Sequence, residues 1–474
     1  MEQNVIGRKK TKQRMLDIYN SGNPEFVAMY GRRRVGKTFL IRQLFENELI
    51  FDLTGLANST TERQLFNFNI AINAASNQEF DVVGDWLFAF EQLRKVIEKS
   101  KKMRKVVFID EIPWLDTPLS GFLSALEHFW NGWACTRNDV MLIVCGSATS
   151  WIINKLVNNH GGLHNRLTAT IHLQPFTLAE TELYLQSQGI EYTPYQIAEC
   201  YMVMGGIPYY LSKLQRGLSV AQNIDNLFFA SDAELKDEFK NLYASLFRNA
   251  TDYIKIVETL SKKTKGLTRN EILETTKMKS GGTFSEILKD LEQCGFIRRY
   301  QMPKKRKYDV LYQLLDQYTL FYFRYLENFD GQDEHFWENI SNSSQHNTWA
   351  GYAFEILSLL HINEIKNALG ISGVQTAIYA WRSEKSTPAS QIDLLIDRKD
   401  GIVNICEMKF HNTQYEITKA DDENFRNKIA AFRTESRTRK AVHLVMLTSF
   451  GVAKNKYYST IQREIQLVDL FRAI

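Results

Sequence analysis

Short apolar runs alternate with longer segments of helical periodicity along the first third of the chain. Residues 26–30 (FVAMY), 106–111 (VVFIDE) and 141–145 (MLIVC) are each dominated by four or five consecutive apolar residues, as expected for strands covered on both faces. The segment 39–48 (FLIRQLFENE) follows the first run with amphipathic spacing. Buried strands that alternate with helices predict an α/β domain with a parallel sheet.

The pattern between residues 250 and 315 is different, with three amphipathic helices followed by two strands. The first helix is expected over residues 250–262, the second opens with a capping-box pair, Thr268 and Glu271, and the third runs from Phe284 to Gly295. Residues 296–315 (FIRRYQMPKKRKYDVLYQLL) predict two strands around a basic tip. Helices and hairpin in this order predict a winged helix.

A third pattern begins near residue 335 and predicts a separate α/β unit. A helix over residues 351–365 precedes apolar segments of strand character. The expected strands are residues 374–382 (VQTAIYAWR), 391–397 (QIDLLID), 402–410 (IVNICEMKF), 440–447 (KAVHLVML) and 465–471 (IQLVDLF).

Length and composition favour a multidomain globular protein. The chain has 474 residues, of which 44% are hydrophobic and 24% charged, and this length suggests two to four domains. No apolar run approaches the roughly 18–20 residues of a membrane span, and the first residues lack the apolar core of a secretory signal. We therefore expect a cytoplasmic protein without membrane contact.

The cysteines limit the kinds of site that the chain can contain, and the charge distribution locates its basic segment. The odd number of cysteines and the absence of close pairs argue against a disulfide framework and against zinc, so buried thiols are expected. These residues are Cys135, Cys145, Cys200, Cys294 and Cys406. The net charge is +4, whereas residues 251–310 alone sum to +6, so the basic character is local.

The segment Gly31–Thr38 (GRRRVGKT) has the spacing of a phosphate-binding P-loop between a strand and a helix. Its glycines let the backbone wrap a phosphate while successive N–H groups face the anion. Lys37 would reach the β- and γ-phosphates and Thr38 would offer its hydroxyl to Mg²⁺. The nucleotide-binding candidates in this loop are Gly31, Arg32, Arg33, Arg34, Val35, Gly36, Lys37 and Thr38.

A P-loop requires a carboxylate at the end of a second strand, and residues 106–111 end in Asp110 and Glu111. Asp110 is the candidate for the Mg²⁺ shell. Glu111 points elsewhere and is the candidate general base for the attacking water.

The strand over residues 141–145 ends in a polar tip, where Ser147 or Thr149 could sense the γ-phosphate. Capping of the next helix is the alternative for either residue. Further along, Arg166 in a glycine-bearing loop is a candidate arginine finger, with a solvated surface arginine as the alternative. A finger that acts in trans would imply a homo-oligomer.

Together these motifs resemble the archaeal-type ATPase family of the AAA+/STAND group, over residues 1–230. Ile6-Gly7-Arg8 is similar to the family's N-terminal box near the base, which implies that Gly7 and Arg8 contact the nucleotide. FIDEIPWL is similar to the Mg²⁺ strand, CGSATSW to the sensor strand, LQPF to the post-sensor element and GGIPYY (205–210) to the lid motif. The segment GLHNR departs from the family's usual aromatic-Gly-Arg turn. The resemblance implies ATP and Mg²⁺ as cofactors and ATP hydrolysis as the activity.

The basic middle region predicts DNA as a partner, bound through residues 250–312. The third helix would read bases and the hairpin tip Lys304–Lys307 (KKRK) would meet phosphates. The alternative is a protein-docking winged helix with a solvated basic hairpin.

Carboxylates recur in the C-terminal unit with a metal-binding layout. Asp393 starts one strand, and Glu407 and Lys409 lie two apart on the next, hence on one face. Such carboxylates bind Mg²⁺ or Mn²⁺, Lys409 orients the nucleophile or offsets charge, and Glu355 on the preceding helix could complete the metal shell. A Glu407–Lys409 ion pair without activity is the alternative.

This order of helix, hairpin and E-x-K resembles the PD-(D/E)XK nuclease superfamily over residues 335–474, although Ile392 stands where a proline is usual. The predicted organisation is a P-loop (AAA+-like) core over 1–175, a helical lid over 176–245, a winged helix over 246–330 and a restriction-endonuclease-like domain over 335–474. It predicts an ATPase that couples nucleotide state to DNA binding and metal-dependent cleavage. The alternatives are a STAND-like regulatory switch and a chaperone-like remodeller whose C-terminal domains dock partners.

Overall fold

The computed structural model divides the chain into two compact units, Met1–Pro175 and Phe176–Ile474. The structure describes residues 5–76, 78–158, 162–163, 165–247, 249–263, 266–301, 310–341, 343–383 and 390–472. The predicted lid, winged helix and C-terminal regions all belong to the second unit.

The first unit contains a five-stranded sheet in the order β2-β3-β4-β1-β5, with every neighbouring pair parallel. The first strand is an inner strand, because Val27 pairs with Ile143 on one side and with Ala169 on the other. The strands are β1 (Glu25–Tyr30), β2 (Leu49–Thr54), β3 (Lys105–Asp110), β4 (Val140–Gly146) and β5 (Ala169–His172). The predicted parallel α/β sheet is thereby confirmed.

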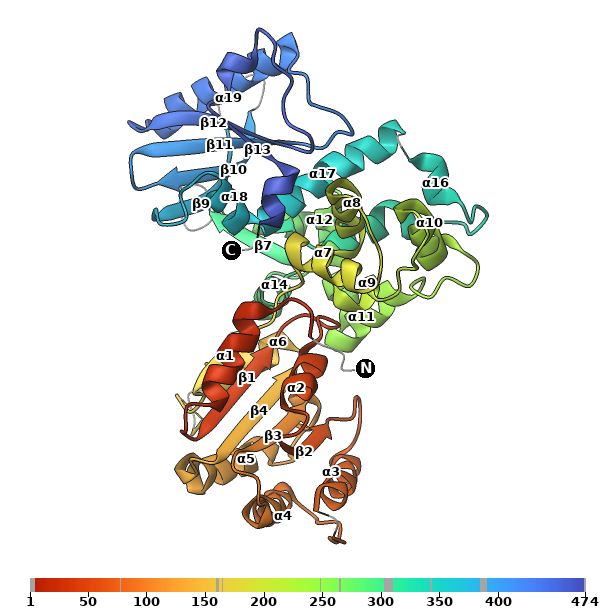
Figure 1. The fold of residues 1–474 in the computed structure, drawn as a ribbon, viewed down its shortest axis with the longest axis vertical. Helices are drawn as coiled ribbons and strands as arrows, with labels where there is room; N and C mark the ends of the chain where they lie inside the picture. Colours follow the sequence, from red (N-terminus) through yellow and green to blue (C-terminus); the bar gives the residue numbers. More distant parts are fainter. Residues whose placement is uncertain are drawn as a thin grey trace. The chain divides into compact units, whose positions relative to one another are not determined.

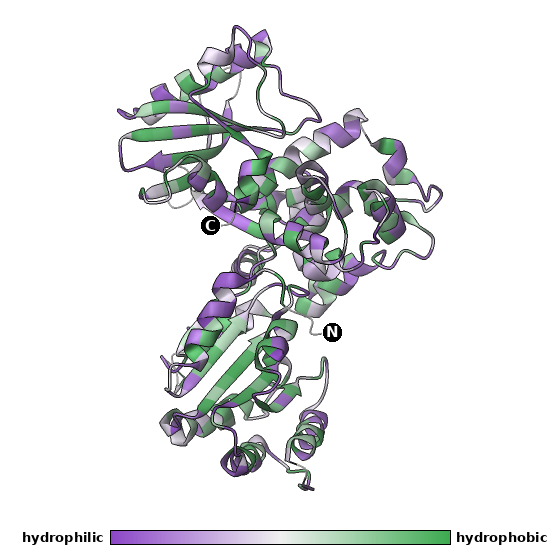
Figure 2. Cartoon of the chain, viewed as in Figure 1, coloured by the Kyte–Doolittle hydropathy of each residue, from purple (hydrophilic) through white to green (hydrophobic). Residues whose placement is uncertain are grey.

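Helices cover both faces of this sheet (Figure 1). One face packs apolar side chains of β1, β3 and β4 against α3, α4 and α5, in a cluster that includes Phe26, Phe68 and Trp86. The elements are α1 (Lys9–Tyr19), α2 (Lys37–Phe45), α3 (Thr61–Ser76), α4 (Trp86–Lys99), α5 (Phe122–Gly132), α6 (Thr149–Ile152) and the turns η1 (Ile112–Trp114), η2 (Ala134–Thr136) and η3 (Ile153–Val157). The strands β1, β3 and β4 are therefore buried almost throughout, and hydrophobic residues, green in Figure 2, make up most of them.

The second unit begins with a helical region. Its segments are α7 (Leu178–Ser187), α8 (Pro194–Met204), α9 (Pro208–Leu211), α10 (Val220–Ile224), η4 (Asp225–Phe229) and α11 (Glu238–Leu246). The end of α8 requires two glycines: Gly205 and Gly206 have φ values of 67° and 65°. A Cβ at Gly206 would lie 2.4 Å from the carbonyl oxygen of Phe176.

Next comes a region of three helices and a small antiparallel sheet in the order β6-β8-β7. The elements are α12 (Ala250–Ser261), β6 (Leu267–Thr268), α13 (Arg269–Thr276), α14 (Gly282–Gln293), β7 (Ile297–Gln301) and β8 (Val310–Leu314). All three predicted helices and both strands are confirmed, and Thr268 and Glu271 form the expected capping box at the start of α13. The predicted basic tip, Lys304–Lys307, lies outside the described residues.

The last region carries a five-stranded mixed sheet in the order β13-β12-β11-β10-β9. The strands β9, β10 and β11 are antiparallel, whereas β11, β12 and β13 run parallel. Its strands are β9 (Thr376–Arg382), β10 (Gln391–Arg398), β11 (Ile402–Lys409), β12 (Ala441–Thr448) and β13 (Arg463–Gln466). The remaining elements of the unit are α15 (Gln317–Phe321), η5 (Tyr322–Leu326), α16 (Phe336–Ile340), α17 (Ser344–Leu360), α18 (Ile362–Ala368), α19 (Lys419–Ser436), η6 (Tyr458–Thr460) and η7 (Leu467–Phe471).

The structure differs from the sequence-based prediction at one strand and one helix of this region. The predicted strand over residues 465–471 stops at Gln466, because Gln466 and Asp469 form a reciprocal capping box that starts the 3-10 helix η7. The helix α19 was not anticipated, although Phe425, Ile429 and Phe432 have helical spacing and join the core of the sheet. Four of the five cysteines are buried free thiols as predicted, and Cys135 is half-buried.

Candidate functional site

The loop between β1 and α2 has the backbone geometry of a phosphate cradle. Gly31 has φ +149°, and a Cβ there would lie 2.3 Å from the carbonyl oxygen of Leu173, so a side chain cannot be accommodated. Gly36 has φ +90° and directly precedes Lys37, the first residue of α2. The loop therefore ends at a helix N-terminus, where free N–H groups attract an anion.

Lys37 is held inside this loop. Its ammonium donates hydrogen bonds to the carbonyl oxygens of Gly31 (2.9 Å) and Arg32 (3.1 Å), and the residue is buried. Of the three arginines in the loop, Arg32 is buried while Arg33 and Arg34 are half-buried. The positive charge of Lys37 thus lies within the cradle predicted to wrap the phosphates.

The end of β3 places Asp110 against the first turn of α2. The Thr38 hydroxyl donates to Asp110 Oδ2 at 2.5 Å, and the Glu111 backbone N–H donates to Oδ1 at 2.8 Å. A hydroxyl and a carboxylate oxygen side by side are hard oxygen ligands that suit Mg²⁺. These two residues fit the predicted metal role.

Cys145 of β4 is a neighbour of Asp110 that the sequence interpretation missed. Its thiol donates to Asp110 Oδ1 at 2.6 Å, because β4 lies beside β3 with Ile109 opposite Val144. Burial raises the pKa of Cys145 well above its usual range, and the charge of Asp110 adds to the effect. The thiol therefore stays protonated and can act as a donor. The feature of the sequence that could have indicated this contact is the position of Cys145 directly before the polar segment 146–150.

Glu111 and Ser147 are directly bonded. The Ser147 backbone N–H and hydroxyl both donate to Glu111 Oε2, at 3.1 and 3.0 Å. Thr149 instead donates to the carbonyl oxygen of Ser147 at 3.5 Å. Neither side chain caps α6, whose N-cap is Ala148, so the capping alternative is wrong. Of the two sensor candidates, Ser147 is the one that contacts the candidate base.

The N-terminal box adjoins the loop, whereas Arg166 lies on a separate, exposed turn. Gly7 and Arg8 have φ values of 66° and 57°, and Arg8 donates to the carbonyl oxygens of Gln174 and, at 3.1 Å, Val35. Arg166 is exposed in the turn before β5. A finger role for Arg166 stays a prediction.

In the second unit, the four predicted residues of the C-terminal site lie close to one another. Pairing of Leu394 with Cys406 brings Asp393 and Glu407 to neighbouring positions at one end of β10 and β11. Burial raises the pKa of Glu355, on α17, well above its usual range, and the charges of Asp393 and Glu407 add to this rise. Lys409 opposes it. Burial likewise raises the pKa of Glu407.

Two further cations reach this carboxylate cluster (Glu355, Asp393 and Glu407) from elements that the sequence motifs did not include. Lys428 of α19 pairs with Glu407 at 2.6 Å between Nζ and Oε1, with 14% and 10% of the two side chains exposed. Arg298 of β7 donates to the carbonyl oxygen of Asp393 at 3.5 Å and to Gln313 at 2.8 Å. Burial lowers the pKa of Arg298, while Asp393 is among the groups that oppose this shift.

The carboxylate cluster has the residue types of a divalent-cation site, but its oxygen atoms are spread apart. Carboxylates are the donors that Mg²⁺ and Mn²⁺ prefer, and the charges of Lys409 and Lys428 oppose the rise in the pKa values of Glu355 and Glu407. Among the described residues, however, the cluster does not bring one oxygen from each carboxylate within 4.8 Å of the others. The residue types fit a divalent cation, and its predicted ligands remain Asp393 and Glu407 with Glu355.

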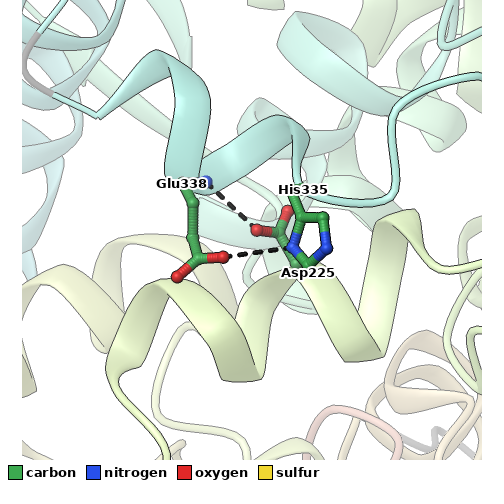
Figure 3. Close-up of side chains that lie close together, drawn as sticks. All are labelled: Asp225, His335 and Glu338. Carbon is green, nitrogen blue, oxygen red and sulfur yellow. Dashed lines mark hydrogen bonds and ion pairs between the residues drawn. The ribbon is translucent and has the colours of Figure 1, made fainter.

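A different group meets that distance: Asp225 with His335 and Glu338 (Figure 3). The Asp225 carboxylate already accepts two hydrogen bonds. They come from the backbone N–H groups of Trp337 (2.7 Å) and Glu338 (3.1 Å) at the start of α16. His335 and Glu338 pair with each other at 3.1 Å on the exposed side. These contacts explain the group as a cap of α16.

Helices that could cross a bilayer are not found among the described residues: none is both long and apolar enough.

Comparisons with known proteins agree with the geometry of the first unit. Residues 6–214 match the family described as an ATPase domain predominantly from Archaea. The chain therefore contains an archaeal-type ATPase domain, which implies nucleotide binding.

Relatives and solved structures were also found for a larger part of the chain. An uncharacterised protein of Methanocaldococcus jannaschii, MJECL04, is 25% identical over 373 residues, which are 76% of this chain and 78% of that protein. The Walker-type ATPase PABY2304 of Pyrococcus abyssi is 16% identical with a TM-score of 0.48, covering 68% of this chain and 96% of its own. The Aeropyrum pernix ORC2 protein, in ADPNP and ADP complexes, is 14% identical with a TM-score of 0.41, covering 68% and 95%.

Proposed function

We propose that this protein hydrolyses ATP in its first unit and acts on DNA with its second unit, through a winged helix and a metal-dependent nuclease site. The observation that carries the proposal is the paired geometry of Asp110 and Glu111. The Asp110 carboxylate accepts a hydrogen bond from the Thr38 hydroxyl, and the Glu111 carboxylate accepts one from the Ser147 hydroxyl. This separates a metal-binding role from a general-base role.

The ATP half of the proposal assigns a role to each side chain. The loop N–H groups and Lys37 bind the phosphates, while Thr38 and Asp110 hold Mg²⁺. Mg²⁺ held by these two residues would offset negative charge on the phosphates. Glu111 accepts the proton of the attacking water, and Ser147 orients its carboxylate. Gly7 and Arg8 support the loop from the side of the base.

The DNA-binding part rests on the order α12, β6, α13, α14, β7, β8, which is that of a winged helix. On α13 and α14 and between them, Lys277, Lys279 and Lys289 are exposed. Exposed lysines in this segment favour contact with phosphates, and such contacts weaken steeply as salt rises. Binding of a fluorescent duplex measured over a salt series tests this part.

The nuclease part rests on the convergence of carboxylates and cations at one end of β10 and β11. A divalent cation at Asp393 and Glu407 would activate water and stabilise charge on the scissile phosphate. Lys409 lies next to this site and is suited to position the nucleophile. Arg298 and Lys428 supply positive charge from two other elements.

Plasmid cleavage in Mg²⁺ or Mn²⁺, with and without ATP, tests the whole proposal. We compare wild type with Lys37→Ala and Glu407→Ala, and use Glu416→Ala as the matched control because Glu416 is an exposed carboxylate of the same region. Cleavage by wild type and Glu416→Ala, lost in Glu407→Ala, supports the nuclease. The Lys37→Ala lane shows whether ATP controls it. Absence of cleavage in all lanes contradicts the nuclease part.

The second candidate is a regulatory switch that hydrolyses ATP and uses its second unit to dock partners. The observation that favours it is the Lys428–Glu407 pair, which gives Glu407 an internal cation as partner. ATP hydrolysis without cleavage, together with DNA binding that does not respond to salt, would select this function.

A further inference from the structure

A basic pocket lies in the C-terminal sheet, away from the carboxylate cluster. It measures about 330 Å³ and opens where β10 ends, β11 begins and α19 gives way to β12. Its walls are Tyr379, Asp397, Val403, Phe432, Ser436, Arg437, Thr438, Arg439 and Lys440. This volume is at the lower end of the roughly 300–1,000 Å³ typical of small-molecule sites.

The only carboxylate of the described lining is already neutralised. Lys440 pairs with Asp397 and also donates to the carbonyl oxygen of Arg398 at 2.6 Å. The hydroxyl of Tyr379 donates to Asp397 Oδ2 at 2.7 Å. Asp397 and Lys440 therefore form a fixed wall with no net charge.

The two remaining charges of the lining are arginines. Among the described residues, Arg437 and Arg439 have no ion-pair partner, and both are exposed. Because guanidinium groups stay protonated at any physiological pH, the pocket carries a net positive charge. Two guanidinium groups offer planar, bidentate donors that match a phosphate group.

The segment that carries these arginines is held by its own hydrogen bonds. The Ser436 hydroxyl donates to the carbonyl oxygen of Phe432 (2.5 Å) and accepts from the N–H of Thr438 (3.3 Å). The Thr438 hydroxyl accepts from the N–H of Lys440 at 3.2 Å. A segment ordered before a ligand arrives loses less entropy on binding.

The other walls are apolar or aromatic. Val403 and Phe432 belong to the core beneath the pocket and Tyr379 packs against it. Val403 and Phe432 are buried and form the floor of the pocket, whereas Tyr379 is partly exposed. A nucleoside attached to the phosphate would pack against the Tyr379 ring.

We propose that this pocket binds the terminal phosphate monoester of a nucleotide, with Arg437 and Arg439 on the phosphate and Tyr379 beside the base. A free mononucleotide and the 5′ end of a nucleic-acid strand present the same chemistry. Asp397 is four residues from Asp393 on β10, roughly 13 Å at 3.3 Å per residue, so a short strand can extend from one site toward the other. The proposal requires neither ATP hydrolysis nor DNA cleavage.

Calorimetric titration of the full chain tests the pocket. Lys37→Ala removes the phosphate-binding lysine of the ATP site, and EDTA removes divalent cations, so neither the P-loop nor the cleavage site contributes. The probes are AMP, a 5′-phosphorylated trinucleotide and the same trinucleotide with a 5′-hydroxyl. Saturable binding of at least one phosphorylated probe is expected, and whichever binds more tightly identifies the source of the phosphate.

Matched variants connect the binding to the arginines. Arg437→Ala/Arg439→Ala is expected to weaken binding about 10–100-fold, the effect of removing charged hydrogen bonds. Arg433→Ala removes an exposed arginine one turn earlier on α19 and outside the lining, and should leave affinity unchanged. Arg437→Lys/Arg439→Lys keeps the charge and should show an intermediate loss.

Three results would overturn the proposal. They are no saturable binding of either phosphorylated probe, equal binding of the 5′-hydroxyl trinucleotide, and binding that survives Arg437→Ala/Arg439→Ala in a chain whose circular dichroism is unchanged.

Discussion

The two units each bring acidic side chains together, but in opposite ways. In the first unit Asp110 and Glu111 are consecutive, and their carboxylates accept hydrogen bonds from neutral donors, among them Thr38 and Ser147. In the second unit Glu355, Asp393 and Glu407 come from three elements, and their neighbours are the charged groups of Arg298, Lys409 and Lys428. The first arrangement is set by backbone geometry and the second by side-chain electrostatics.

This difference predicts how each site responds to substitution. Each carboxylate of the first site accepts hydrogen bonds from more than one neutral group, so the loss of one donor turns the carboxylate without leaving it unpaired. Buried opposite charges depend on one another, because removal of one leaves the other uncompensated. The first site should therefore fail in chemistry while it remains folded, and the second should fail in stability as well.

The largest expected effect is that of Glu111→Gln. Loss of the general base should lower ATP turnover about 10²–10⁴-fold, while nucleotide binding through the loop persists. Phosphate release and binding of a fluorescent ATP analogue measure the two quantities. Turnover that stays near wild type would remove Glu111 from the mechanism.

Lys428→Met, in the second site, should reduce the stability of the protein. It removes the ion-pair partner of the buried Glu407, so the free energy of unfolding should fall by about 3–5 kcal/mol, measured by urea denaturation without divalent cations. The double variant Glu407→Gln/Lys428→Met should recover most of the loss, since both charges are then gone. Saturating Mn²⁺ should also stabilise Lys428→Met if Glu407 is a metal ligand. A double variant no more stable than Lys428→Met would contradict the dependence.

Ser147→Ala sharpens the comparison within the first site. One hydrogen bond to a charged group is worth about 1.5–3 kcal/mol, so turnover should fall about 10–100-fold with nucleotide affinity little changed. Thr149→Ala is the matched control, because its hydroxyl contacts only a backbone carbonyl at 3.5 Å. Equal losses in both variants would argue against a specific role of Ser147.

Glu199 extends the comparison to a buried carboxylate without a described ion-pair partner. It lies on α8 beside Tyr195, whose ring stacks on Phe410 at 4.6 Å. Burial raises the pKa of Glu199 to about 7. The native state therefore holds this proton more tightly than the unfolded state does, and its contribution to stability is present below pH 4.5 and lost as the pH rises to about 7.

Glu199→Gln should consequently stabilise the second unit at pH 8 by roughly 1–3 kcal/mol, with no gain at pH 4. Denaturation at the two pH values measures this difference. A gain of the same size at both would show that the side chain's shape, and not its charge, is responsible.

The sequence predicted the first site better than the second for a physical reason. Strand, loop and helix are contiguous around Lys37 and Thr38, and backbone geometry alone fixes their relation. Cys145 was missed because its contact with Asp110 depends on which strands become neighbours. Lys428 and Arg298 were missed because they are 21 and 109 residues from Glu407 in the chain and reach the carboxylate cluster only through tertiary packing.

Arg298 also bears on how this chain can be divided. Its guanidinium is buried between Gln313, which belongs to the three-helix region, and the backbone of Asp393, which belongs to the C-terminal sheet. A protein cut near residue 335 would remove this acceptor of Arg298, and it would also expose Tyr300 and Leu311, which pack against Ala380 of β9. Truncations and fusions that contain one of the two regions without the other should therefore yield insoluble products. The three-helix region and the C-terminal sheet should be expressed and transferred together.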